Sequence, residues 1–302
     1  MASAAPPFSR ILVPFDGSDP ARAALKLAIV LAQQKMDLFI ATIVDETALI
    51  DDSASTMVAF DPTPIMEELD AQGKVLLDEA TAQCRAAGVT AKVQLVHDRP
   101  VGGILSSGEG HGCDLIIMGT HARSGLARVF LGSTTEGILR LSRVPVLAVR
   151  TIDHIDAAPF ASVIVAVDDS EPADAAAAVA ARLARGAGAS VTGCYVVDTI
   201  HLYENAANFG FDPEPLAREM RDGAEAIVHA ALARAGLAGD TPVVVVEGEP
   251  VSAIVASAKE RHATLIVCGT HGRRGVRRFV LGSVAEHLVR TSEIPVLVVP
   301  IP

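Results

Sequence analysis

Short apolar runs rich in β-branched residues alternate along the chain with longer segments whose apolar residues recur at helical spacing. In the first half, strand-like runs cover residues 10–15, 38–44, 91–97, 114–118 and 145–149, and helical patterns cover 20–34, 64–87 and 133–142. A further helix is expected after the turn at Pro100. Most of these runs are apolar at successive positions, which is typical of strands covered on both faces of a parallel sheet. The pattern therefore predicts an α/β fold.

The second half of the chain repeats this order of elements. Its strand-like runs cover 162–167, 190–197, 242–247, 264–268 and 295–299, and its helical patterns cover 172–186, 215–235 and 283–292. Pro145-Val-Leu-Ala-Val149 returns 150 residues later as Pro295-Val-Leu-Val-Val299, which indicates a tandem duplication. We predict a domain at 1–150, a linker at 151–160 and a second domain at 161–302. Each should be a Rossmann-like, doubly wound sheet of five parallel strands.

Composition excludes several classes of protein. The 302 residues are 50% apolar and 20% charged, which excludes intrinsic disorder. A formal net charge of −11 disfavours nucleic-acid and anionic-membrane partners. No apolar run reaches the roughly 18–20 residues that span a bilayer, and the N-terminus lacks a signal-peptide pattern. We therefore expect a cytoplasmic protein with no nucleic acid and no membrane among its partners. The four cysteines lack disulfide or metal-site spacing and are interpreted as structural.

Two features of each repeat point to ligand chemistry. Asp16 and Asp168 end the first strand of their repeat, and a glycine loop follows the fourth strand. In a doubly wound sheet these ends lie at the carboxyl edge, beside the point where strand order reverses. In the second repeat the loop runs Gly269-x-x-Gly272, nine further residues and then Gly282-Ser283 at a helix start. Glycines let backbone N–H groups turn toward one anion, and a helix N-terminus adds unpaired N–H groups.

Each feature has a plainer interpretation. The glycines can form only a tight turn and a helix cap, and the aspartates can cap the following helix. The long loop spacing occurs in both repeats, each time after a strand, which favours anion binding. Ser18 and Ser170 already stand in capping positions, which favours a ligand role for the aspartates.

With Val-x-x-Asp at the end of the first strand, this loop pattern resembles the universal stress protein family. The resemblance covers essentially the whole chain as two tandem family domains, and the second repeat carries the full pattern of the ATP-binding branch. It implies ATP, AMP or ADP held by backbone amides of the loop, with Mg²⁺ on the phosphates. It also implies that the last strands pair, so that the tandem chain is an intramolecular pseudo-dimer. Bare apolar edges invite aggregation, so such pairing is physically sensible.

The resemblance also assigns site residues by position. Asp168 would meet the adenosine, Val196 would pack on the base, and Cys268 and Gly269 would lie beside the sugar. The phosphates would be met by Gly272, Gly282 and Ser283, with Val284 next to them. The matching residues of the first repeat are Asp16, Ile43, Met118, Gly119, Gly132, Ser133 and Thr134.

The first repeat departs from the pattern at Ala122, which replaces the second glycine. If that position needs a left-handed backbone, alanine costs about 1–2 kcal/mol. Such a penalty weakens binding by about fivefold to thirtyfold. We therefore expect the better site in the C-terminal domain.

Other residues leave their roles open. His121 and His271 lie inside the glycine loops, where phosphate contact and plain exposure are equally consistent with the sequence. The arginines at 273, 274, 277 and 278 could screen phosphate charge or belong to a solvated loop. The loops at 46–63 and 199–214 are long enough to act as lids over the nucleotide sites. Surface packing explains them equally well.

The resemblance thus implies a regulatory stress-response module that binds ATP and acts with an unknown protein partner, with a homodimer of the tandem chain as a further option. No Walker A lysine, general base or metal cluster is evident, so we assign no catalytic or metal-ligating residue and expect at most weak ATP hydrolysis. Two alternatives stay open. One is a slow ATPase or autophosphorylating enzyme, with Ser133 and Ser283 nearest the phosphates. The other is an interaction scaffold without nucleotide.

Overall fold

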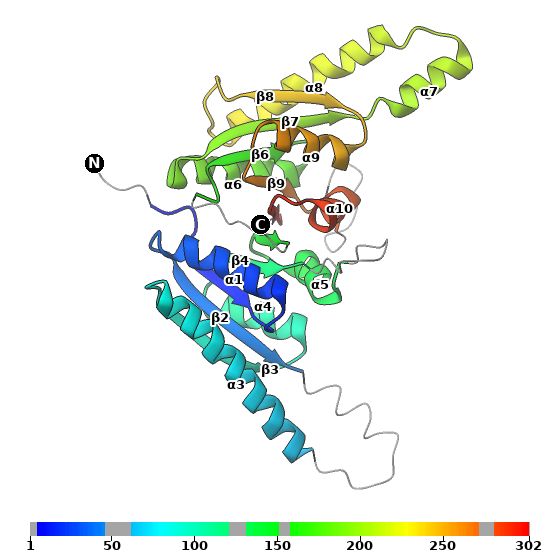
Figure 1. The fold of residues 1–302 in the computed structure, drawn as a ribbon. Helices are drawn as coiled ribbons and strands as arrows, with labels where there is room; N and C mark the ends of the chain where they lie inside the picture. Colours follow the sequence, from blue (N-terminus) through cyan, green and yellow to red (C-terminus); the bar gives the residue numbers. More distant parts are fainter. Residues whose placement is uncertain (1–4, 46–61, 121–130, 151–157, 272–280, 302) are drawn as a thin grey trace, which may run out of the picture. The chain divides into compact units, whose positions relative to one another are not determined.

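The computed structural model describes residues 5–45, 62–120, 131–150, 158–271 and 281–301 (Figure 1). The chain divides into two compact units, Phe8–Ile155 and Asp156–Pro302, and the second also includes the N-terminal residues up to Pro7. Each unit contains five parallel strands and an apolar core of its own.

The first unit alternates strands and helices as the sequence predicts. Its elements are β1 (Arg10–Pro14), α1 (Asp19–Ala32), β2 (Asp37–Val44), α3 (Thr63–Ala86), β3 (Ala91–His97), α4 (Pro100–Gly110), β4 (Leu115–Gly119), α5 (Ser133–Leu141) and β5 (Val146–Val149). The strands are parallel and lie in the order β3-β2-β1-β4-β5. Strand order therefore reverses between β1 and β4.

The second unit repeats this topology. Its elements are β6 (Ser162–Ala166), α6 (Glu171–Ala187), β7 (Ser190–Val197), α7 (Ile200–Phe209), α8 (Glu214–Arg234), β8 (Val243–Glu247), α9 (Pro250–Glu260), β9 (Leu265–Gly269), α10 (Ser283–Thr291) and β10 (Val296–Val299). The order β10-β9-β6-β7-β8 reverses between β6 and β9. The predicted doubly wound, five-stranded α/β fold is confirmed in each unit.

Helices cover both faces of each sheet, which explains the uninterrupted apolar strands. In the second unit α6 and α8 pack together on one face, while α9 and α10 pack together on the other. Strand β9, which lies between β10 and β6, is consequently buried from Leu265 to Cys268. The strands at the β3 and β8 ends of the sheets are more exposed.

One expected loop is a helix. We expected a loop over residues 199–214, but α7 occupies most of that segment and ends at Gly210, whose φ of 70° is a left-handed C-cap. Figure 1 shows α7 extending away from the sheet of its unit. The corresponding segment of the first repeat, 46–61, lies outside the described residues.

The N-terminal residues lie against α6. A Cβ atom on Gly186 would stand 2.7 Å from the Pro7 nitrogen and 2.8 Å from the Ala5 carbonyl oxygen. Gly186 therefore permits this close approach of backbone to helix.

All four cysteines are free and buried. Among the helices of the described ranges, none is both long enough and apolar enough to cross a membrane.

Candidate functional site

The turn from β6 into α6 holds Asp168 at the carboxyl edge of the sheet. The Ser170 hydroxyl donates to Asp168 Oδ1 at 2.5 Å and accepts from the Ala173 N–H at 3.3 Å, so Ser170 is the N-cap of α6. Asp169 between them has a φ of 60°. This left-handed residue turns the chain tightly enough to bring Ser170 back onto Asp168. Asp168 is half-buried and oriented by its neighbour.

The first unit builds the same turn with a different hydrogen bond. Asp16 Oδ1 accepts from the backbone N–H of Ser18 at 3.0 Å, and Ser18 in turn caps α1 by accepting from Ala21 N–H at 3.3 Å. Gly17 provides the left-handed position, with a φ of 73°. Serine is the helix cap in both units, so the capping interpretation of Asp16 and Asp168 is excluded.

Gly269, the last residue of β9, serves packing. A Cβ atom there would lie 2.5 to 2.7 Å from atoms of Pro172 in the first turn of α6. Gly119 approaches Pro20 in the same way at the end of β4. The absence of a side chain thus lets the strand end meet the helix start. It leaves the Gly269 backbone half-exposed at the carboxyl edge.

Cys268 and Met118, the residues before these glycines, point into the core. Their exposed fractions are 4% and 5%. Burial raises the pKa of the Cys268 thiol to about 12, so it is a neutral, apolar packing group. Each residue can therefore offer a ligand its backbone but not its side chain.

The start of α10 is tied to the end of β9. The Thr270 N–H donates to the Val299 carbonyl at 3.1 Å, and the Gly282 N–H donates to the Thr270 carbonyl at 2.7 Å. Gly282 is the N-cap of α10, with φ −67° and ψ 147°. The Gly282 amide is therefore engaged by a backbone carbonyl, and its φ is not left-handed. Gly282 sets where α10 begins, and its place at the phosphates stays a prediction.

The first turn of α10 supplies the N–H groups expected at the phosphates. The Glu286 N–H bonds to the Gly282 carbonyl at 2.9 Å, so the intrahelical ladder starts there. The amides of Ser283, Val284 and Ala285 precede it and have no acceptor within the helix. Ser283 is exposed, whereas Val284 is half-buried. In the first unit Gly132 caps α5, with Ser133 and Thr134 in the matching positions.

Val196 and Ile43 end the neighbouring strands. Val196 is half-buried near the end of β7, where it stands opposite Val246 of β8. Ile43 holds the matching place in β2, but it is covered from one side. A Cβ on Gly103 of α4 would lie 3.1 Å from Ile43 Cγ2. Val196 and Ile43 are thus apolar side chains, one strand from the reversal point, that retain some exposure.

His271 stands beside these groups, and the sequence left its role undecided. Its Nδ1 lies 2.9 Å from the Thr270 hydroxyl. Its Nε2 is buried and has no hydrogen-bond partner in the described part of the chain. A buried ring nitrogen without a partner disfavours the interpretation of His271 as a fully exposed loop residue.

The reversal point brings most of these residues together. β6 pairs with β9 from Val163 opposite Leu265 to Val165 opposite Val267, and on its other side it pairs with β7. The ends of all three strands therefore lie at one edge. That edge carries Asp168, Val196, Gly269 and the first turn of α10. Gly272, Ala122 and the loop arginines lie outside the described residues.

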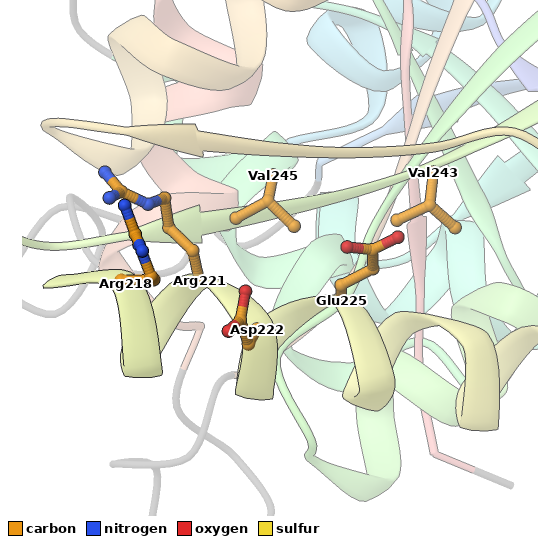
Figure 2. Close-up of a pocket in the computed structure, with 6 residues that line it drawn as sticks. All are labelled: Arg218, Arg221, Asp222, Glu225, Val243 and Val245. Carbon is orange, nitrogen blue, oxygen red and sulfur yellow. The ribbon is translucent and has the colours of Figure 1, made fainter. Parts of the chain in front are cut away.

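A separate hollow of about 440 Å³ lies elsewhere in the second unit. Figure 2 shows its lining residues, which come only from α8 and β8: Arg218, Arg221, Asp222, Glu225, Val243 and Val245. β7 separates β8 from β6 and β9. This hollow is therefore distinct from the edge described above.

Comparison with known proteins decides the family. The model of the universal stress protein family matches residues 7–150 and again 159–300. The chain belongs to the universal stress protein family. It is 30% identical over 147 residues to the universal stress protein YxiE of Bacillus subtilis, an alignment that covers 47% of this chain and 99% of the relative. A universal stress protein of Mycobacterium bovis is 29% identical over 220 residues, 70% of this chain and 69% of its own.

The tandem arrangement has a solved counterpart among universal stress proteins. The crystal structure of such a protein from Archaeoglobus fulgidus superposes with a TM-score of 0.70 at 24% identity and covers 97% of this chain and 98% of its own. This likeness establishes the fold. The resemblance drawn from the loop glycines and the strand-end aspartates is thus confirmed at the level of the family.

Proposed function

We propose that this universal stress protein binds an adenine nucleotide at the carboxyl edge of the second unit and acts as a cytoplasmic regulatory module of the stress response. One observation carries the proposal: a half-buried carboxylate, oriented by Ser170, shares this edge with the first-turn amides of α10, which have no acceptor within that helix. A nucleotide has the matching polarity, with hydroxyl donors at its ribose and anionic oxygens at its phosphates.

The residues divide into two groups by this polarity. The Asp168 carboxylate repels phosphate but accepts hydrogen bonds, so it suits a ribose hydroxyl. The amides of Ser283 and Val284 suit phosphate oxygens. Val196 provides apolar contact for the base, and the Gly269 backbone lies between the two groups. Gly282 acts by fixing the start of α10. Mg²⁺, where present, would be held through the phosphates.

The first unit is proposed as a second, weaker site. It has the corresponding Asp16, Gly119, Ser133 and Thr134 at its own reversal point. Its hydrogen bonding differs because Asp16 accepts from a backbone amide rather than from a serine hydroxyl. Ile43 is also covered on one side by α4. These differences, together with Ala122, support stronger binding in the second unit.

The first experiment measures the nucleotide that accompanies the protein. The chain is purified without added nucleotide and denatured in acid, and released adenine nucleotides are counted per chain by chromatography. We expect close to one ATP per chain, lost in Asp168→Ala and kept in Asp16→Ala. Two per chain would show equal sites. Release of ADP or AMP in place of ATP would favour the alternative of a slow ATPase. ATP hydrolysis by the purified chain would then be assayed directly.

A null result is resolved by adding ATP. If nothing is released, thermal unfolding is repeated with saturating ATP, which raises the melting temperature of any protein that binds it. No shift, in a chain whose circular dichroism shows it folded, would overturn nucleotide binding and favour the scaffold.

A further inference from the structure

The strands at the outer edges of the two units differ in a way that the nucleotide site does not explain. β8 presents four consecutive valines, Val243 to Val246, and all four are half-exposed. The matching edge strand β3 carries Lys92 and Gln94, and Lys92 Nζ lies 5.2 Å over the Phe39 ring. Lysine on an edge strand is a common protection against unwanted strand pairing. β3 has that protection, whereas the valine run of β8 does not.

The backbone of β8 has hydrogen-bonding groups that point away from β7. Pro242 accepts from the Gly193 N–H at 2.9 Å, and the Gly248 N–H donates to the Val197 carbonyl at 3.1 Å. In a parallel pair, alternate residues bond to the neighbouring strand. Even-numbered residues of β8 therefore face β7, and Val243 and Val245 direct their N–H and C=O groups to the open edge. These are the groups that another strand would use.

Charged side chains of α8 flank this edge in a definite order. Figure 2 shows Glu225 next to Val243 and Arg221 beside Val245, with Arg218 close to Arg221. Arg221 is committed within the unit, because it pairs with Glu214 at 2.7 Å and also with Glu247. Arg218, Asp222 and Glu225 are exposed. Glu214 and Glu247 neutralise Arg221 at the Val245 end, so Arg218 is the exposed cation there. Glu225, whose carboxylate lies 3.7 Å from His229, is the exposed anion at the Val243 end.

We propose that β8 is the interface for a second copy of this chain, paired antiparallel about a two-fold axis at Val244. In that register Val243 of each copy exchanges backbone hydrogen bonds with Val245 of the other. The two-fold axis also reverses the order of charges, so Arg218 of each copy approaches Glu225 of the other. The edge is therefore complementary to itself, which a two-fold contact between identical chains requires.

Charge order favours a second copy over an unrelated strand. An arbitrary extended segment could use the backbone groups, but it would meet the exposed cation Arg218 at one end and the exposed carboxylate Glu225 at the other. Only a partner with the reverse order satisfies both, and the same chain turned by 180° has that order. The proposal concerns β8 alone and does not depend on nucleotide binding.

Charge reversal tests the proposal. Sedimentation equilibrium of the full chain across the micromolar range should show a dimer. Arg218→Glu places like charges together at two symmetry-related contacts and should weaken the dimer by about tenfold. Glu225→Arg should do the same. The double variant Arg218→Glu/Glu225→Arg restores opposite charges and should return the dissociation constant to within about threefold of the native value.

A variant that removes a backbone hydrogen-bond donor tests the proposal independently of charge. Val243→Pro removes an outward N–H at the first residue of the strand, a position where proline is tolerated. It should weaken the dimer while leaving the circular dichroism spectrum unchanged. A chain that sediments as a monomer throughout, or a dimer unaffected by both Arg218→Glu and Val243→Pro, would overturn the proposal. The proposal would also be overturned if the double charge variant formed a dimer no tighter than those of the two single variants.

Discussion

At the residue scale, Gly269 lies at the candidate site, but its lack of a side chain is required by packing against α6 and not by a ligand. A side chain on Gly269 would overlap Pro172, at 2.5 to 2.7 Å. We expect Gly269→Ala to lower the free energy of unfolding by about 1–3 kcal/mol, since the strand end and α6 must move apart. Urea denaturation of the nucleotide-free protein measures this. The control is Gly223→Ala in α8, where a Cβ meets nothing within 4 Å. That change should stabilise by up to about 1 kcal/mol. Equal stability of the two variants would contradict the packing role.

Glu249 is a second residue whose role has a measurable signature. It caps α9 by accepting from the N–H groups of Val251 at 3.1 Å and Ser252 at 2.8 Å. Partial burial acts to raise the pKa of Glu249, but the hydrogen bonds from Ser252 and Val251 and the nearby His287 outweigh it. The pKa therefore lies below its usual value. The folded state thus binds this proton more weakly than the unfolded chain.

The sign of the pH effect follows. The stabilisation by Glu249 is complete above the unfolded pKa of about 4.3 and disappears as pH falls through the lower folded pKa. We expect Glu249→Gln to be less stable than the native protein at neutral pH, with the difference shrinking below about pH 4. Urea midpoints across this range measure it. Arg99→Gln is the matched control, because Arg99 is the N-cap of α4 but makes no side-chain hydrogen bond to that helix. Its effect on stability should not change across this pH range. A constant difference between Glu249→Gln and native protein would contradict the assignment.

At the scale of elements, the sequence predicted nearly every strand and helix and missed one. Strand positions were clear because parallel strands buried on two faces are apolar without interruption. Boundaries differ by one or two residues, as at the helix predicted over 172–186 and observed as α6, Glu171–Ala187. The missed element, α7, contacts the sheet too little to impose a strong apolar stripe. Gly210 was the available signal, as a C-cap placed before a proline turn.

The described hydrogen bonds from α7 to the rest of its unit come from Tyr203 and the N-cap Thr199, so α7 should be the least protected helix of the second unit. Arg221 donates to Glu214 at 2.7 Å, and the Tyr203 hydroxyl donates to the same carboxylate at 3.3 Å. Thr199 donates to Glu247, which also pairs with Arg221. Exposed ion pairs each contribute about 0.2–1 kcal/mol. The amides of α7 should thus exchange faster than those of α6. Arg221→Met should raise the exchange rate in α7 by a further factor of about three to ten.

The control for that experiment lies one turn away. Arg218 is also on α8 and exposed, but its charge acts on Glu214 more weakly than that of Arg221, which donates a hydrogen bond to Glu214. Arg218→Met should therefore change exchange in α7 much less than Arg221→Met. The lid predicted from loop length is then testable. Added ATP should slow exchange in α7 if the helix closes over the nucleotide. Protection confined to the start of α10 would show that it does not.

At the scale of the whole molecule, the duplication allowed the fold to be predicted from the sequence, whereas the site could be predicted only in part. The spacing from Gly269 to Ser283 located a strand end and a helix start correctly. It could not show that the Gly282 amide is engaged by Thr270, since that depends on how the loop closes. Nor could it show that Cys268 faces the core, because a strand buried on both faces gives no alternation from which to assign sides.

Two cores in one chain should also respond separately to damage. Leu31 of α1 and Leu183 of α6 hold matching places in the two repeats, and both are fully buried. Replacing either with alanine should cost about 2–5 kcal/mol of its own unit. If the better nucleotide site lies in the second unit, ATP should raise the melting temperature of the transition that Leu183→Ala lowers. It should leave the transition lowered by Leu31→Ala nearly unchanged. Differential scanning calorimetry of both variants, with and without ATP, measures this. If ATP instead raises the melting temperature of the transition that Leu31→Ala lowers, the stronger site lies in the first unit. Ala122 would then cost little nucleotide affinity.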